Sequence, residues 1–321
     1  MQHVLGVLLA IFSALAFSSS DVAIRRGVVR APVSHGAFVT VMLGVPLFAL
    51  AALVSGQMLR VDDLTGASYG LLAAAGIVHY VVGRYFNYAA IEAIGAARSG
   101  PVQALGLPYS VAIALLFLDE EITLGMAIGI ALIVVGPLVM IERRGAVRTT
   151  APARSTSSGP AVALGEKSQG LPLRQVEGYL FAVIAAISYG SSPVFIRAAL
   201  EGESGLSVLG GFVSYLAAAA LLLATLVIPS RRSLIGALNP SSARLFFVAG
   251  FFVFLAQLLR FVALSLAPVA LVTTLLRFTG IFTLALSWVL NRSLEYITLR
   301  TVAAILISVA GAVLLVVTRA D

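Results

Sequence analysis

The segment Ser19-Ser20-Asp21-Val22-Ala23-Ile24-Arg25 occurs a second time, in altered form, as Ser191-Ser192-Pro193-Val194-Phe195-Ile196-Arg197. In both places it closes a long apolar run, one starting near Gly6 and the other near Gly178. A second repeated motif precedes the last apolar run of each half: Glu120-Glu121-Ile122-Thr123 in the first half and Glu295-Tyr296-Ile297-Thr298 in the second. The chain is therefore predicted to consist of two related halves, as many membrane proteins with internal repeats do.

The composition places this duplicated chain in a lipid bilayer. It is 60% hydrophobic and only 11% charged, whereas an average soluble domain carries about 25% charged residues. The chain has no cysteine, which excludes disulfides, thiolate metal ligands and thiol nucleophiles. Its three histidines are too scattered for a metal-binding spacing. We therefore expect neither a metal nor a cofactor.

Apolar runs of about twenty residues are long enough to cross the hydrocarbon core as helices. The sequence contains ten such runs, which predicts an all-α integral membrane protein with ten transmembrane helices in two five-helix repeats. Because five is odd, the second repeat enters from the opposite side, so the repeats are inverted. The predicted spans are residues 4–24, 36–56, 69–91, 96–118, 124–141, 177–197, 206–228, 244–264, 268–290 and 297–318.

A basic stretch with several serines, glycines and prolines separates the two halves. Its low hydrophobicity and turn-forming residues predict a flexible linker rather than a folded domain. The predicted organisation is a first repeat over 1–141, a linker over 142–176 and a second repeat over 177–321. No soluble catalytic domain is expected.

Basic residues gather on one side of the predicted bilayer, the side that holds the linker. Short loops rich in Lys and Arg stay in the cytoplasm. We therefore expect a cytoplasmic linker and both termini outside, in the cell (inner) membrane. The net charge of +7 then reflects topology, and no nucleic-acid partner is expected. Residues assigned to the basic side are Arg25, Arg26, Arg30, Arg98, Arg231, Arg232, Arg244, Arg292 and Arg300.

Several short motifs resemble those of a known transporter repeat. In the first half they are Ala90-Ile91, Ile94-Gly95-Ala96-Ala97-Arg98-Ser99, Pro108 and Leu118-Asp119-Glu120, and in the second Ala263-Leu264, Ala267-Pro268-Val269-Ala270, Leu294-Glu295 and Gly311. The chain is similar to the ten-helix EamA branch of the drug/metabolite transporter (DMT) superfamily. It departs from the pattern at Thr283, where the first half has Pro108, and at Asn291-Arg292 before the second glutamate.

The resemblance implies a transporter for small metabolites, often an exporter of amino acids or similar solutes. It also implies that the third, fourth, eighth and ninth helices line a central cavity.

Three arginines lie deep inside predicted spans, where charged side chains are costly and usually functional. Arg84 falls in the third span, Arg260 in the eighth and Arg277 in the ninth. The helical rise places each roughly 10–13 Å deep, near the middle of a core about 30 Å thick. Guanidinium groups bind carboxylates and phosphates bidentately, so the three arginines predict a site for an anionic group. In the alternative, each neutralises an acid such as Glu92 or Asp21, or bonds the carbonyl groups of a broken helix.

Other polar residues fall at a similar depth and complete the predicted substrate site. Gln257 is the repeat counterpart of Arg84, and His79 is also a candidate proton relay. For the remaining residues, the alternative is a hydrogen bond between helices. The set comprises His79, Tyr80, Asn87, Gln103, Tyr109, Gln257, Thr273 and Thr274.

Three acidic residues have a structural interpretation. Asp21 is either a coupling proton site or an ion-pair partner of Arg25, and the ion pair is favoured. The repeated Glu120 and Glu295 fall at turns, where we expect them to stabilise helix N-termini through the helix dipole.

Prolines and small residues carry further structural predictions. Pro101 and Pro108 predict a kink in the fourth span that points towards the site. Small residues on the fifth and tenth spans predict close helix packing, within the chain rather than between copies. They are Gly125, Gly129, Ala304, Ser308 and Gly311.

These patterns favour a secondary transporter, not an enzyme, that exports amino acids or other anionic or zwitterionic metabolites by alternating access. The alternatives are a broad-specificity drug or cation efflux transporter and, more remotely, a membrane-embedded lipid-modifying enzyme. The chain has no G-x-x-x-x-G-K-[ST] nucleotide loop and no G-x-S-x-G motif. The expected partners are a small-molecule solute and the lipid bilayer. The sequence is compatible with both a monomer and a homo-oligomer.

Overall fold

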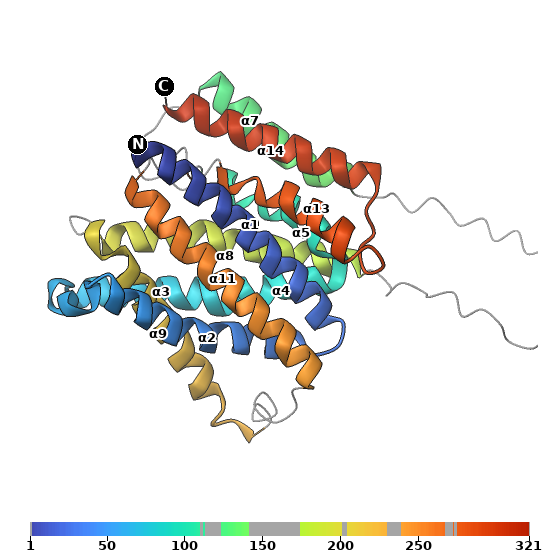
Figure 1. Cartoon of the computed structure of the whole chain (residues 1–321). Coiled ribbons are helices and arrows are strands. Elements are labelled where there is room, and N and C mark those ends of the chain that lie inside the picture. The colour runs from blue at the N-terminus through green and yellow to red at the C-terminus, as the bar shows by residue number, and fades with distance from the viewer. Residues whose placement is uncertain are drawn as a thin grey trace, which may run out of the picture.

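The computed structural model describes residues 2–109, 112, 123–140, 174–200, 204–229, 239–266, 272 and 275–320. Within these ranges all regular structure is helical and no strand occurs, as the sequence predicted (Figure 1). Thr273, Thr274 and Glu120 lie outside the described residues, as does most of the predicted linker.

In the part of the chain that the structure describes, six helices are long and apolar enough to cross a bilayer. They are α1 (Gln2–Val28), α2 (Val33–Val54), the continuous run of α3 (Gly66–Gly76), η2 (Ile77–Gly83) and α4 (Arg84–Ile94), α8 (Gln175–Ala199), α9 (Ser207–Thr225) and α11 (Pro240–Leu266).

Further helices account for the remaining predicted spans. They are α5 (Ala96–Gln103), α7 (Leu124–Met140), α13 (Thr279–Leu290) and α14 (Leu299–Ala320), and the 3₁₀ turns η1 (Gln57–Asp63) and η3 (Ser204–Leu206) lie between spans. Every predicted span thus has a helix in the described part of the chain. The first span runs to Val28 rather than residue 24, so Arg25 belongs to the helix and not to a loop.

The sequence explains where several helices begin and break. The Thr65 hydroxyl accepts from the Ser68 nitrogen at 3.1 Å and so caps the start of α3. Gly95 alone connects α4 to α5, with φ at +89°, a conformation that is accessible almost only to glycine. The fourth span loses regular helix just after Pro101, at Ala104, as its prolines predicted.

The packing of the helices follows a symmetric pattern between the halves. α1 packs on α11 and α13, and its counterpart α8 packs on α4 and α5. α2 packs on α11, and its counterpart α9 packs on α3. Three further pairs join counterparts directly: α2 with α9, α5 with α13, and α7 with α14. This is the pattern that a twofold axis between two repeats produces.

Reciprocal contacts mark where this axis runs between α2 and α9. Gly44 of α2 lies directly against the ring of Tyr215, and Gly211 of α9 lies directly against the ring of Phe48. In each helix the aromatic residue follows its glycine by four positions. The same contact is therefore made twice with the roles exchanged, as in an isologous interface.

The α7–α14 pair repeats this arrangement with backbone atoms. A Cβ on Gly129 would lie 2.8 Å from the Leu315 nitrogen, and one on Gly311 would lie 2.9 Å from the Ile133 nitrogen. Small residues at these positions let the two backbones meet. The predicted small faces thus pack on each other within the chain.

Contacts at one end of the bundle show that the halves are inserted in opposite directions. Arg25, near the end of α1, donates to the carbonyl oxygens of Ile91 and Glu92 near the end of α4. Gly178, near the start of α8, lies against Ile94 at the same end of α4. α1 therefore ends where its counterpart α8 begins, and the predicted inversion is confirmed (Figure 1).

Candidate solute-binding site

The third span is not α-helical throughout, because Ile77–Gly83 forms a π-helix between α3 and α4. Such segments have wider turns and are frequent at functional sites. This one carries His79 and Tyr80 and packs against α8 and α9. The apolar pattern of the sequence predicted the span but not the π segment within it.

His79 joins the two halves through both of its ring nitrogens. His79 Nδ1 lies 2.7 Å from Ser192 Oγ on α8, and Nε2 lies 3.2 Å from Gln257 Nε2 on α11. Both contacts are within hydrogen-bonding distance, and the direction of each depends on the tautomer of the imidazole. His79 thus links η2 of the first half to α8 and α11 of the second.

Arg84 is held by aromatic side chains rather than by an acid. It is 2% exposed, and its Nη2 donates to the Tyr215 hydroxyl at 2.7 Å. The guanidinium carbon lies 4.9 Å from the ring centre of Tyr80 and 5.2 Å from that of Tyr215, a cation–π arrangement. In the described structure Glu92 pairs with Arg174 instead, at 3.0 Å. Arg84 therefore already has its partners inside the protein.

Arg260 and Arg277 are less completely satisfied. The Nε atom of each is buried and has no hydrogen-bond partner among the described residues. The guanidinium of Arg260 lies 5.2 Å from the Phe261 ring centre, and no acidic side chain of the described structure forms an ion pair with either arginine. The two cations lie within electrostatic range of each other, which is unfavourable in a buried place.

His79 connects these arginines to Arg84, because it lies within electrostatic range of both Arg84 and Arg260. The fold thus brings the three predicted arginines into one neighbourhood, together with His79 and Gln257. They come from η2 and α4, from α11, and from the turn that precedes α13.

The other predicted residues form bonds between helices in the same region. Gln103 Nε2 donates to Asn87 Oδ1 at 2.8 Å, which links α5 to α4. The Tyr109 hydroxyl lies 3.0 Å from Ser191 Oγ on α8. For these residues the structure contains the interhelical bond that was the alternative to a role in binding. Among the described residues, no group of three His, Asp or Glu side chains could hold a metal ion.

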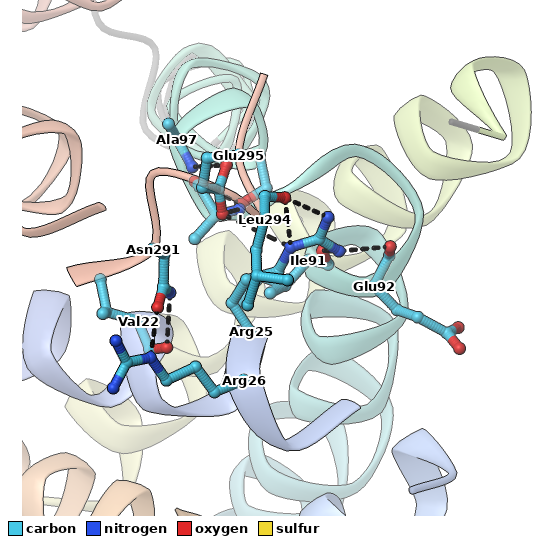
Figure 2. Close-up of polar contacts among 11 residues, drawn as sticks. Val22, Arg25, Arg26, Ile91, Glu92, Ala97, Asn291, Leu294 and Glu295 are labelled. Atoms are coloured by element: carbon cyan, nitrogen blue, oxygen red, sulfur yellow. Dashed lines mark hydrogen bonds and ion pairs between the residues drawn. The ribbon is translucent and has the colours of Figure 1, made fainter. Parts of the chain in front are cut away.

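The expected ion pair between Asp21 and Arg25 is wrong. Arg25 is 2% exposed, and Arg25 Nε lies 3.6 Å from Glu295 Oε1. Arg25 Nη2 also donates to the Leu294 carbonyl at 2.7 Å (Figure 2). Arg25 is thus turned away from its own helix towards the loop between α13 and α14.

Glu295 completes this junction from the other side. It accepts from the backbone nitrogens of Ala96 at 2.8 Å and Ala97 at 3.4 Å, at the start of α5. The expectation that it stabilises a helix N-terminus is met on α5 of the opposite half, not on α14 beside it. Burial raises the pKa of the Glu295 carboxyl above its ordinary value, against the opposing effects of Arg25 and the two N–H groups.

A second contact reinforces the junction beside it. Arg26 Nε donates to Asn291 Oδ1 at 2.6 Å, and Asn291 Nδ2 donates to the Val22 carbonyl at 2.9 Å (Figure 2). Arg98, predicted to lie on the basic surface, is 1% exposed and sits over the Tyr296 ring, 4.8 Å from its centre. The repeated glutamates were the sequence signal for this junction, although they did not reveal its partners.

Comparison with known proteins gives a family match over both halves. The model of the EamA-like transporter family matches residues 4–141 and 176–317. No curated protein sequence matches the chain. A solved structure described only as "Crystal structure of protein" has a TM-score of 0.56 and 17% sequence identity, over 98% of this chain and 98% of that chain. At this identity the likeness concerns the fold alone.

Proposed function

The chain belongs to the EamA-like transporter family, and on that premise we propose that it is a secondary transporter, an exporter of small anionic or zwitterionic metabolites such as amino acids. Alternating access between the inverted halves carries the solute across the membrane. The family is one of transporters, not of enzymes, so a lipid-modifying activity is set aside.

The observation that carries this proposal is that the buried Nε groups of Arg260 and Arg277 have no hydrogen-bond partner among the described residues. A carboxylate or phosphate of the solute satisfies both donors with charge-assisted hydrogen bonds. It also relieves the repulsion between the two guanidinium groups. Arg84 contributes positive potential, while two of its donors are used by Tyr215 and Thr40.

The polar side chains around the arginines recognise the rest of the solute. Gln257 has a buried Oε1 without a hydrogen-bond partner in the described structure, so it offers an acceptor to an ammonium or hydroxyl group. Together with the arginines, this acceptor favours a zwitterion such as an amino acid.

A drug or organic-cation exporter fits these residues less well. Cation sites need acidic or open aromatic surfaces, and here the faces of Tyr80 and Tyr215 are already next to Arg84. Three neighbouring arginines repel a cationic solute.

The proposal is tested with the purified protein in detergent. Thermal unfolding is measured with amino acids, other carboxylates, inorganic phosphate and organic cations. We expect amino acids or other carboxylates to raise the unfolding temperature of the natural protein, and Arg260→Ala and Arg277→Ala to lose most of that shift. Arg300→Ala, at an exposed arginine of α14, should keep it. Stabilisation by organic cations alone, or an unchanged carboxylate shift in both variants, would sink the proposal.

The Arg25–Glu295 junction has a place in the same cycle. It ties α1 and α5 of the first half to the α13–α14 loop of the second, at the end where α8 begins (Figure 2). We assign to it the closure of the site on this side, which must open for solute to pass. We further propose that this side faces the cytoplasm, because Arg26, Arg174, Arg244, Arg292 and Arg300 lie there.

A further inference from the structure

Asp21 is an acidic side chain within α1 that the proposed solute site does not use. It lies seven residues before Val28, the end of the membrane span Val4–Val28, hence roughly 10 Å inside it. In the described structure no basic side chain forms an ion pair with it. Its polar neighbour is the side chain of Asn87 on α4.

The charged and titratable groups around Asp21 do not compensate a negative charge. Tyr88 from α4 and Tyr189 from α8 lie within electrostatic range of it. Glu295, from the loop before α14, also lies in range and is itself acidic. Arg25, one turn later on α1, is directed to Glu295 and Leu294. An ionised carboxylate at this depth is therefore costly, and a protonated one is tolerated.

Asp21 is nevertheless not fully enclosed by the protein. It is only half-buried, as are Gln103 and Tyr189 nearby. Tyr88 and Tyr189 also lie within electrostatic range of Arg84, so Asp21 and the arginine cluster share these two neighbours.

We propose that Asp21 is the proton-coupling group of this transporter, an inference that rests on the proposed function because coupling requires a transport cycle. In the release step the O–H bond of the carboxylic acid breaks, the proton passes to water to form hydronium, and the carboxylate remains. Uptake reverses the step. The repeat counterpart of Asp21 is Pro193, so the position supplies one titrating group per chain and not two.

The test needs no solute, because the ligand is the proton. Protein in liposomes on a solid-supported membrane receives a pH jump, and the transient charge movement is recorded. We expect a transient from the natural protein, loss of it in Asp21→Asn, and its retention in Glu177→Gln, an exposed acid at the start of α8. An Asp21→Asn protein with the natural transient overturns the inference.

A second measurement covers the case in which Asp21→Asn does not fold. Infrared titration of the natural protein should show a carboxylic-acid C=O band that disappears as the pH rises, and Asp21→Glu should shift that band. The absence of a band that Asp21→Glu shifts also overturns the inference.

The two proposals fail independently. Carboxylate binding that depends on Arg260, without titration of Asp21, contradicts the coupling role only. Titration of Asp21 without binding of any anion contradicts the solute class only.

Discussion

At Glu295 a single carboxylate joins three segments that are distant in the sequence. It pairs with Arg25 of α1 and accepts from Ala96 and Ala97 at the start of α5. Removing one partner of a buried ion pair leaves the other charge uncompensated, at a cost of about 3–5 kcal/mol. The junction is thus a place where one side chain decides the stability of the contact between the halves.

We expect Glu295→Ala to lower the thermal unfolding temperature strongly, because Arg25 and two N–H groups lose their acceptor. Glu295→Gln should cost less, since an amide oxygen still accepts from Ala96. Unfolding is followed by fluorescence in detergent, with the exposed Glu177→Ala as the control. Equal unfolding temperatures for all three variants would contradict this account.

Gly95 is the residue that lets α4 turn into α5. Its φ of +89° is strained for any other residue, and a Cβ there would overlap Glu295 Oε2. We expect Gly95→Ala to cost at least about 1–3 kcal/mol from backbone strain alone, read as loss of monodisperse protein on size exclusion. Gly70→Ala in α3 is the matched control, because a Cβ there meets nothing within 4 Å. It should fold like the natural protein, and if it fails as badly, the clash is not the cause.

At the residue scale the sequence located the arginines but not the partners of Arg25. Arg84, Arg260 and Arg277 could be placed at one depth, because depth follows from counting residues along a helix. The choice of Glu295 over Asp21 as the partner of Arg25 depends on how a loop of the other half folds over α1. Local spacing carries no information on such a contact.

Among the elements, α7 and α14 form a pair whose close approach depends on glycine. We expect Gly129→Val to push the two backbones apart and to lower the unfolding temperature, because its Cβ would meet Leu315 and the Gly311 carbonyl at 2.8 to 2.9 Å. Gly70→Val in α3, where a Cβ meets nothing within 4 Å, makes the same residue change without the contact. The pair of variants is compared by thermal unfolding. Similar values would show that the helices are not held this closely.

The element boundaries followed from hydrophobicity better than the helix type did. Runs of apolar residues predicted every span that has a described helix, since burial in lipid requires length and little else. The π segment Ile77–Gly83 was missed because its wider turns leave the composition of the span unchanged.

For the whole molecule, the inverted arrangement follows from an odd number of spans in each half. Which helices touch did not follow from the sequence, because the pairing of α1 with α11 and of α8 with α4 depends on packing across the axis. The matching G-x-x-x-aromatic spacing of Gly44 and Phe48, and of Gly211 and Tyr215, was present in the sequence as a signal for that axis.

Because the chain has no cysteine, the proposed orientation can be tested by labelling single cysteines introduced into it. Single cysteines are introduced at two exposed positions on opposite ends, Asp63→Cys in η1 and Glu177→Cys near the start of α8. With an impermeant maleimide on intact cells, we expect labelling of Asp63→Cys at once and of Glu177→Cys only after permeabilisation. The reverse pattern would place the linker outside, and the unmodified chain serves as the blank.

The π segment in the third span determines how α4, which follows it, is rotated about the helix axis relative to α3. In an α-helix each residue advances the direction of its side chain by about 100°, so the extra room in η2 turns α4 relative to α3. Arg84, the first residue of α4, points at Tyr215 only with that offset in place. The deletion of one residue between Ile77 and Gly83 would swing the guanidinium and Asn87 round the helix while leaving every remaining side chain intact. The length of this segment, counted residue by residue, thus specifies the site as strictly as its chemistry does.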